Sequence, residues 1–135
     1  GNLNKPIIAQ FLFANEENAQ KINSIVHPEV KEDFRSWASA QSADLIFMES
    51  AILFESGFND VVDKVITITA SLETRIERTI RRDNTTKEQV IARMNQQMQD
   101  EERIRLSDYI ISNNTNDNAE QQIKTIIETL SKQVQ

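Results

Sequence analysis

The sequence contains no cysteine and only two glycines among its 135 residues, Gly1 and Gly57. Without cysteine, the chain can form neither a disulfide nor a thiolate metal site. Two glycines cannot build the glycine-rich loop that cradles phosphate groups in many kinases, and no Gly-Lys pair is present. No apolar run reaches membrane-spanning length and no signal-peptide pattern is seen, so we expect cytoplasmic residence and no membrane partner.

The sequence also has fewer basic than acidic residues: 15 lysines and arginines against 21 acidic residues, which leaves a net charge of −6. This balance argues against broad electrostatic binding to nucleic acid, although a local basic patch can still hold one phosphate group. The length and a hydrophobic content of 39% are typical of one globular domain with its own core.

Three short segments carry the pattern of β-strands. Leu45–Met48 and Val65–Ile68 are apolar runs bounded by polar residues, as in strands covered on both faces of a parallel sheet, and Tyr109–Ile111 is a third candidate. Glu49 and Glu55 follow the first run, where open α/β sheets gather their ligands. A solvated loop is an equally good interpretation of these two carboxylates. The segments together predict an α/β fold in which helices flank a parallel sheet.

Residues 1–42 carry helical patterns and predict a helical region ahead of the sheet. The first helix is expected over residues 1–14, and Asn15 is placed to cap the second. The second helix should end at His27, because Pro28 disfavours the α conformation in the residue before it. A third helix would then begin at Pro28.

Helical patterns return after the second predicted strand. Ser71 is a suitable N-cap for the first of these helices, and Thr85 with Glu88 has the spacing of a capping box for the next. Asp117 with Glu120 has the same spacing ahead of an amphipathic C-terminal helix.

The helix after Ser71 presents a series of arginines, with Arg75, Arg78 and Arg82 at i, i+3 and i+7. Guanidinium groups match phosphate oxygens, so this face is suited to closing over a polyphosphate. A solvated face whose arginines pair with nearby glutamates is the alternative interpretation. His27, the only histidine, is more often a cap or turn residue than a catalytic base in this context, and no acidic or histidine cluster has metal-ligand spacing.

Several segments, taken together and in order, resemble the dephospho-coenzyme A kinase family. Segment Lys21–Val30 is similar to the His-Pro segment of that family, and Ala51–Gly57 to its Leu-Phe-Glu segment. The first residue of each segment departs from the family, which more often has leucine and proline there. Further blocks of resemblance are Arg78–Asp83, Arg93 with Gln97, and Asp108–Asn113.

The resemblance implies transfer of the γ-phosphoryl group of ATP to the 3′-hydroxyl of dephospho-coenzyme A. It also implies an incomplete P-loop-kinase-type sheet of order 2-3-1-4-5, with Leu45–Met48 as strand 3 and Val65–Ile68 as strand 4. Four regions follow from it: a coenzyme-A-binding helical region over 1–42, the core strands over 43–70, the lid helices over 71–106, and strand 5 with the C-terminal helix over 107–135.

The same resemblance assigns roles to individual residues. Arg82 and Arg78 would be catalytic lid arginines, His27 and Glu55 would bind substrate, and Asn113 would lie near the adenine of ATP. It assigns no metal ligand to this chain. ATP and Mg²⁺ are the cofactors expected of the full-length enzyme, with dephospho-coenzyme A as its substrate, and this chain alone is not expected to bind them tightly.

The family's phosphate loop and its early catalytic aspartate would precede Gly1. We therefore interpret the chain as a C-terminal piece that is inactive by itself and self-associates through its incomplete sheet. Two other hypotheses stay open. One is a different small-molecule P-loop kinase with a similar lid, and the other is a non-catalytic, nucleotide-kinase-like binding or scaffold domain.

Overall fold

The computed structural model describes residues 4–134 and divides the chain into two compact units, Gly1–Ser42 and Ala43–Gln135. The first unit contains helices α1 (Lys5–Leu12) and α2 (Glu16–Ser39), which contact each other. The helix predicted over residues 1–14 is shorter than expected, and its first three positions lie outside the described residues.

Helix α2 runs unbroken through Pro28, so the predicted end at His27 and the predicted third helix are wrong. Asn15 caps α2 as expected, its side chain accepting a hydrogen bond from the N–H of Asn18 at 2.8 Å. A proline inside a helix removes one backbone hydrogen bond, but more than two helical turns on each side propagate cooperatively across that gap. No described residue of α1 or α2 is buried.

The segment that opens the second unit is irregular, and Leu45–Met48 forms no strand, contrary to prediction. Isolated strands do not persist without a ladder partner, and no described segment pairs with this one. Leu45 is instead packed against the core formed by the last strand and the last helix. A short 3₁₀ helix, η1 (Phe58–Val61), follows Gly57, whose φ of 74° is the left-handed conformation that favours glycine.

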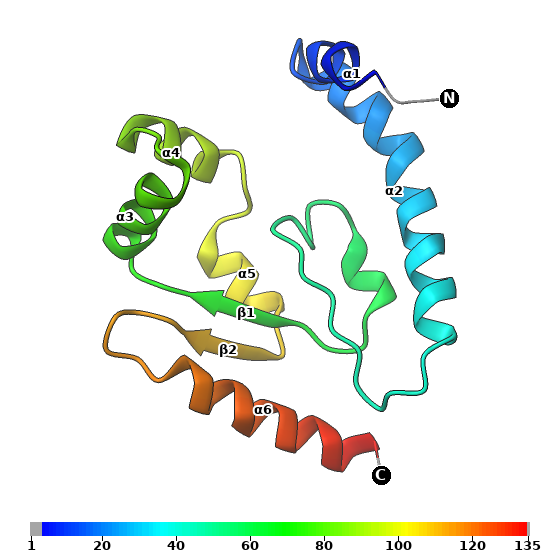
Figure 1. Ribbon diagram of the computed structural model, residues 1–135, viewed down its shortest axis with the longest axis vertical. Helices are drawn as coiled ribbons and strands as arrows, with labels where there is room; N and C mark the ends of the chain where they lie inside the picture. Colours follow the sequence, from blue (N-terminus) through cyan, green and yellow to red (C-terminus); the bar gives the residue numbers. More distant parts are fainter. Residues whose placement is uncertain (1–3, 135) are drawn as a thin grey trace. The chain divides into compact units, whose positions relative to one another are not determined.

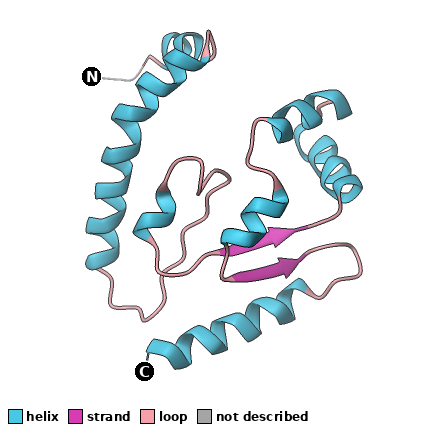
Figure 2. Ribbon diagram, turned by 180° about the vertical axis from the view of Figure 1, so that it is seen from behind, coloured by secondary structure: helices cyan, strands magenta, loops and turns pink. Residues whose placement is uncertain are grey.

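Two parallel strands form the sheet: β1 (Ile66–Thr69) and β2 (Tyr109–Ser112). They confirm the strands predicted over Val65–Ile68 and Tyr109–Ile111 to within one residue, and they confirm the α/β class with a parallel sheet. Figure 2 shows the strands side by side and pointing the same way. Parallel pairing requires a long crossover, and the helices between the strands supply it.

The crossover contains three helices: α3 (Leu72–Asp83), α4 (Lys87–Asn95) and α5 (Asp100–Leu106). Ser71 caps α3 as predicted, with its hydroxyl accepting a hydrogen bond from the N–H of Thr74. α3 packs against α4, and α5 contacts β1. No helix in the described part of the chain is both long and apolar enough to cross a membrane.

The capping box of α4 lies one residue beyond its predicted place. Thr86 accepts from the N–H of Gln89, and the Gln89 side chain accepts from the N–H of Thr86, whereas Thr85 with Glu88 had been expected. An N-cap needs a non-helical backbone, and Thr86 is extended, with φ of −104° and ψ of 159°.

Helix α6 (Ala119–Val134) closes the chain and lies along β2 (Figure 1). Its core contacts are Ile126 and Leu130, which cluster with the 2% exposed Ile111 of β2. The predicted capping box of Asp117 with Glu120 is wrong, because the first turn of α6 is capped by Asn118, which accepts from the N–H of Gln121.

Asp117 organises the loop between β2 and α6 instead of capping the helix. Its carboxylate accepts hydrogen bonds from the hydroxyl of Ser112 and from the N–H of Asn114. These two bonds, that of Ser112 first, lower the pKa of Asp117 from its ordinary value of 3.8. Gln122 of α6 bonds both the N–H and the carbonyl of Ser112, so the end of β2 is held from two directions.

We expect Asp117→Asn to destabilise the protein at pH 7 and to lose that effect in acid. A carboxyl whose pKa is lowered by folding contributes stability above its unfolded pKa, and this contribution disappears as pH falls through the folded value. Urea unfolding between pH 7 and pH 3 should therefore show the two proteins converging below about pH 4. Asp63→Asn, which removes an exposed carboxylate elsewhere, is the control. A stability difference that stays constant or grows in acid would contradict this role.

Candidate functional site

The carboxyl ends of β1 and β2 meet at one edge of the sheet and position the two segments that follow them. The N–H of Asn113 donates to the carbonyl of Thr69 at 2.8 Å, which extends the ladder by one step beyond β2. The N–H of Ser71 donates to the side-chain oxygen of Asn114 at 2.7 Å. The start of α3 and the loop after β2 are thus tied together, at the edge where open α/β sheets bind ligands.

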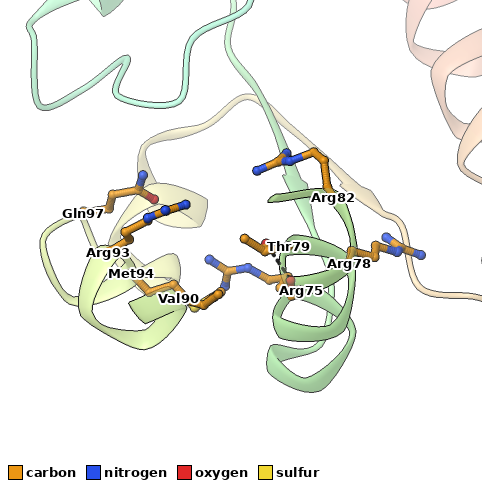
Figure 3. A pocket seen from close by; sticks show the side chains of 8 residues that line it. All are labelled: Arg75, Arg78, Thr79, Arg82, Val90, Arg93, Met94 and Gln97. Carbon is orange, nitrogen blue, oxygen red and sulfur yellow. Dashed lines mark hydrogen bonds between the residues drawn. The ribbon is translucent and has the colours of Figure 1, made fainter. Parts of the chain in front are cut away.

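A cavity of about 310 Å³ lies between α3 and α4. The two helices are joined by a sharp turn at Asn84, whose φ of 50° is in the left-handed region that asparagine tolerates better than most residues. The apolar floor includes Val90, which is 2% exposed. The lining residues are Arg75, Arg78, Thr79, Arg82, Val90, Arg93, Met94 and Gln97 (Figure 3).

Three of the lining arginines are paired with carboxylates. Arg82 donates to Asp83 from Nε at 2.8 Å and from a terminal nitrogen at 3.0 Å, while Arg93 of α4 donates to the same carboxylate at 3.2 Å. Arg75, only 27% exposed, pairs with Asp100 at the start of α5. The cavity therefore presents several guanidinium groups in a chain that is acidic overall.

The pKa values around Asp83 follow from this pairing. The hydrogen bond from Arg82, and then its charge, lower the pKa of the Asp83 carboxyl, with Arg93 adding to the effect in spite of some desolvation. The same bond and the charge of Asp83 raise the pKa of Arg82. Both groups are thus charged at neutral pH.

Arg78 has a different orientation from the other predicted lid arginine. A terminal nitrogen of its guanidinium donates to the backbone carbonyl of Asn113 at 2.6 Å. Figure 3 shows the side chain pointing to the side of α3 away from α4. The structure therefore brings together two of the predicted site residues, Arg78 and Asn113, while Arg82 faces the space between the helices.

Glu55 and His27 lie outside the cavity lining. Glu55 lies within the irregular segment that opens the second unit, and its side chain accepts from the N–H of Met98 at 3.4 Å, so it contacts the segment between α4 and α5. His27 is half-buried on α2 and belongs to the first unit.

Two residues carry more of the site than the sequence indicated: Arg93, which lines the cavity, and Asp83, which binds the cavity arginines. Both had been noted only as parts of segments that resemble the family. A usable signal was present for Asp83, because an acidic residue in the last turn of a helix opposes the helix dipole and needs another partner. No group of three or more potential metal ligands occurs among residues 4–134.

Comparisons with known proteins identify the family of this chain. The family model for dephospho-CoA kinase matches residues 1–119. A dephospho-CoA kinase of Bacteroides fragilis is 48% identical over 114 residues, which cover 84% of this chain and 56% of the relative. The chain therefore spans little more than half the length of that curated relative.

Two solved structures are similar at 27% sequence identity. A Thermus thermophilus protein superposes with a TM-score of 0.79 over 98% of this chain and 68% of its own. The dephospho-CoA kinase from Campylobacter jejuni superposes with a TM-score of 0.66 over 99% of this chain and 68% of its own. The fold is thus that of the P-loop kinases, and the match of the family model across residues 1–119 places the chain in the dephospho-CoA kinase family.

Proposed function

We propose that this chain supplies the lid and part of the core of an ATP-dependent kinase that phosphorylates the 3′-hydroxyl of dephospho-coenzyme A. That reaction is the last step of coenzyme A biosynthesis. The observation that carries the proposal is the cavity between α3 and α4, where Arg75, Arg82 and Arg93 converge from two helices. The activity belongs to a protein in which a phosphate loop, absent from these 135 residues, completes the site.

The cavity residues fit a polyphosphate chemically. A guanidinium has five N–H donors, so Arg82 can keep its two bonds to Asp83 and still donate to phosphate oxygens. Arg82 and Arg93 are 74% and 57% exposed, so a ligand can reach both side chains. ATP supplies the phosphoryl group when bound, and these arginines stabilise the charge on its oxygens.

The remaining predicted residues take supporting roles in this proposal. Arg78 holds the carbonyl of Asn113, so a movement of α3 is transmitted to the loop that we place near the adenine. Glu55 and His27 are each assigned a role in binding dephospho-coenzyme A. Mg²⁺ is expected with ATP, but no residue of the described part of the chain is assigned to it.

A non-catalytic binding domain is the second candidate, and the absence of a Gly-Lys phosphate loop from the sequence favours it. Both candidates require phosphate binding at the arginines. Only the kinase requires turnover once a phosphate loop is supplied.

The 135-residue chain alone should show no kinase activity, because positioning of the β- and γ-phosphates supplies most of the catalysis of phosphoryl transfer. ADP release from ATP and dephospho-coenzyme A, followed in a coupled assay, should equal the blank. Joining the chain to the remaining part of the Bacteroides fragilis relative should produce turnover. Turnover by the chain alone would refute the inactivity, and a well-folded but inactive chimera would favour the non-catalytic candidate.

In such an active chimera, Arg82→Ala should lower kcat by about tenfold or more, since a guanidinium that faces developing phosphoryl charge contributes that much. Arg78→Ala should have a milder effect. Arg81→Ala is the matched control, because Arg81 is exposed on the same helix and does not line the cavity. If the Arg82 and Arg81 variants have equal rates, Arg82 has no catalytic role, and the arginines of α3 only form a solvated surface.

We also propose that the isolated chain self-associates through β1. In the described residues β1 pairs only with β2, and Ile68 of β1 is 60% exposed. An unpaired strand edge is a template for another chain. Multi-angle light scattering should show species heavier than the 15.5 kDa monomer at micromolar concentration. A single monomeric peak would contradict the proposal.

A further inference from the structure

The carboxylate of Asp83 joins arginines that come from different helices. Its Oδ1 accepts from Nε of Arg82, the residue before it on α3, and its Oδ2 accepts from Arg82 and from Arg93 of α4. Arg82 and Arg93 both line the cavity, but Asp83 does not. Figure 3 shows the two arginine side chains reaching from their helices toward the space between them.

Local helix stability does not account for an aspartate at this position. Asp83 is the last residue of α3, where the helix dipole disfavours negative charge, and it precedes a left-handed Asn84. Aspartate also has a low helix propensity. Pairing with the two arginines is the compensating interaction in the structure.

Packing does not hold the two arginines in place, since their side chains are 74% and 57% exposed. Free arginine side chains lose considerable rotamer entropy when they bind a ligand. Arginines already held by Asp83 have lost much of that freedom before a ligand arrives. A shared carboxylate also sets the spacing between the guanidinium groups.

We propose that Asp83 is a positioning residue for polyphosphate binding, which holds Arg82 and Arg93 at the spacing that the ligand requires. This inference rests on the proposed function, because it takes the α3–α4 cavity as the phosphate site. It predicts that neutralising Asp83 weakens polyphosphate binding, which is the opposite of what charge repulsion alone predicts. A carboxylate beside a polyanion repels it, so charge alone predicts tighter binding when Asp83 is neutralised.

Phosphate oxygens bound by these guanidinium groups would lie within the screening length of about 8 Å at an ionic strength of about 0.15 M, so some repulsion persists. The charge of the carboxylate is, however, already balanced by its direct contacts with two arginines. We therefore expect the ordering effect to exceed the repulsion. Calorimetric titration of the 135-residue chain with inorganic tripolyphosphate should show Asp83→Asn binding about tenfold more weakly than the unmodified chain.

Glu77→Gln is the matched control, because it removes one negative charge from an exposed position on the same helix, outside the cavity lining. It should leave affinity unchanged or slightly improve it. Equal or tighter binding by Asp83→Asn would overturn the positioning role. Loss of helical circular dichroism in Asp83→Asn would also overturn it, since Asp83 would then be needed for folding.

The Nε–H resonances of the arginines separate this inference from the proposed function. In the ligand-free chain, Asp83→Asn should shift and sharpen the Arg82 and Arg93 signals, as the side chains gain motion, and leave Arg75 unchanged. Weak binding by the unmodified chain is enough for this comparison, and if no binding is seen even at the highest soluble concentration of tripolyphosphate, the phosphate site itself is refuted. If it binds and the two signals do not respond to Asp83→Asn, the phosphate site stands and the role of Asp83 is refuted.

Discussion

The parallel pairing of β1 with β2 is the constraint on which the candidate site depends. The register places Thr69 beside Ser112, and the next step of the ladder joins Thr69 to Asn113. Because both strands end at this edge, the start of α3 lies beside the loop after β2, although more than 40 residues separate them in the sequence. This register brings together the partners of two bonds, from Ser71 to Asn114 and from Arg78 to Asn113.

The second feature of the site is the way in which its positive charge is balanced. Asp83 and Asp100 pair with the cavity arginines, so the guanidinium groups are ordered without being buried deeply. Exposed ion pairs contribute little to stability. In the role that we propose, their value is geometric, because they would hold arginines from α3 and α4 together for one ligand instead of leaving them as independent surface charges. Asp117 also fixes the loop between β2 and α6 through hydrogen bonds to Ser112 and Asn114, and this loop holds Asn113 in place.

The sequence predicted those parts of the fold that local patterns determine. β1, β2 and the Ser71 cap followed from apolar runs and side-chain chemistry, and the family resemblance followed from motifs in order. The wrong predictions are those in which a local signal competed with its surroundings or a strand had no neighbour to pair with. Pro28 was overridden by the helix on both sides of it, and Leu45–Met48 lacked a neighbouring strand.

Within the site, spacing placed Arg75, Arg78 and Arg82 on a common helix but did not predict their partners. Arg78 turns to the carbonyl of Asn113, and Arg82 shares Asp83 with Arg93. These contacts depend on how α4 folds back after Asn84 and on the strand register. Both are tertiary properties that a helical period does not contain.

The most direct test of the central claim is a crystal structure of an active enzyme containing this chain, bound to a non-hydrolysable ATP analogue. The account predicts triphosphate oxygens within hydrogen-bond distance of Arg82 and Arg93, with Asp83 still bound to both arginines. A triphosphate bound elsewhere, with the α3–α4 cavity filled only by solvent, would contradict it.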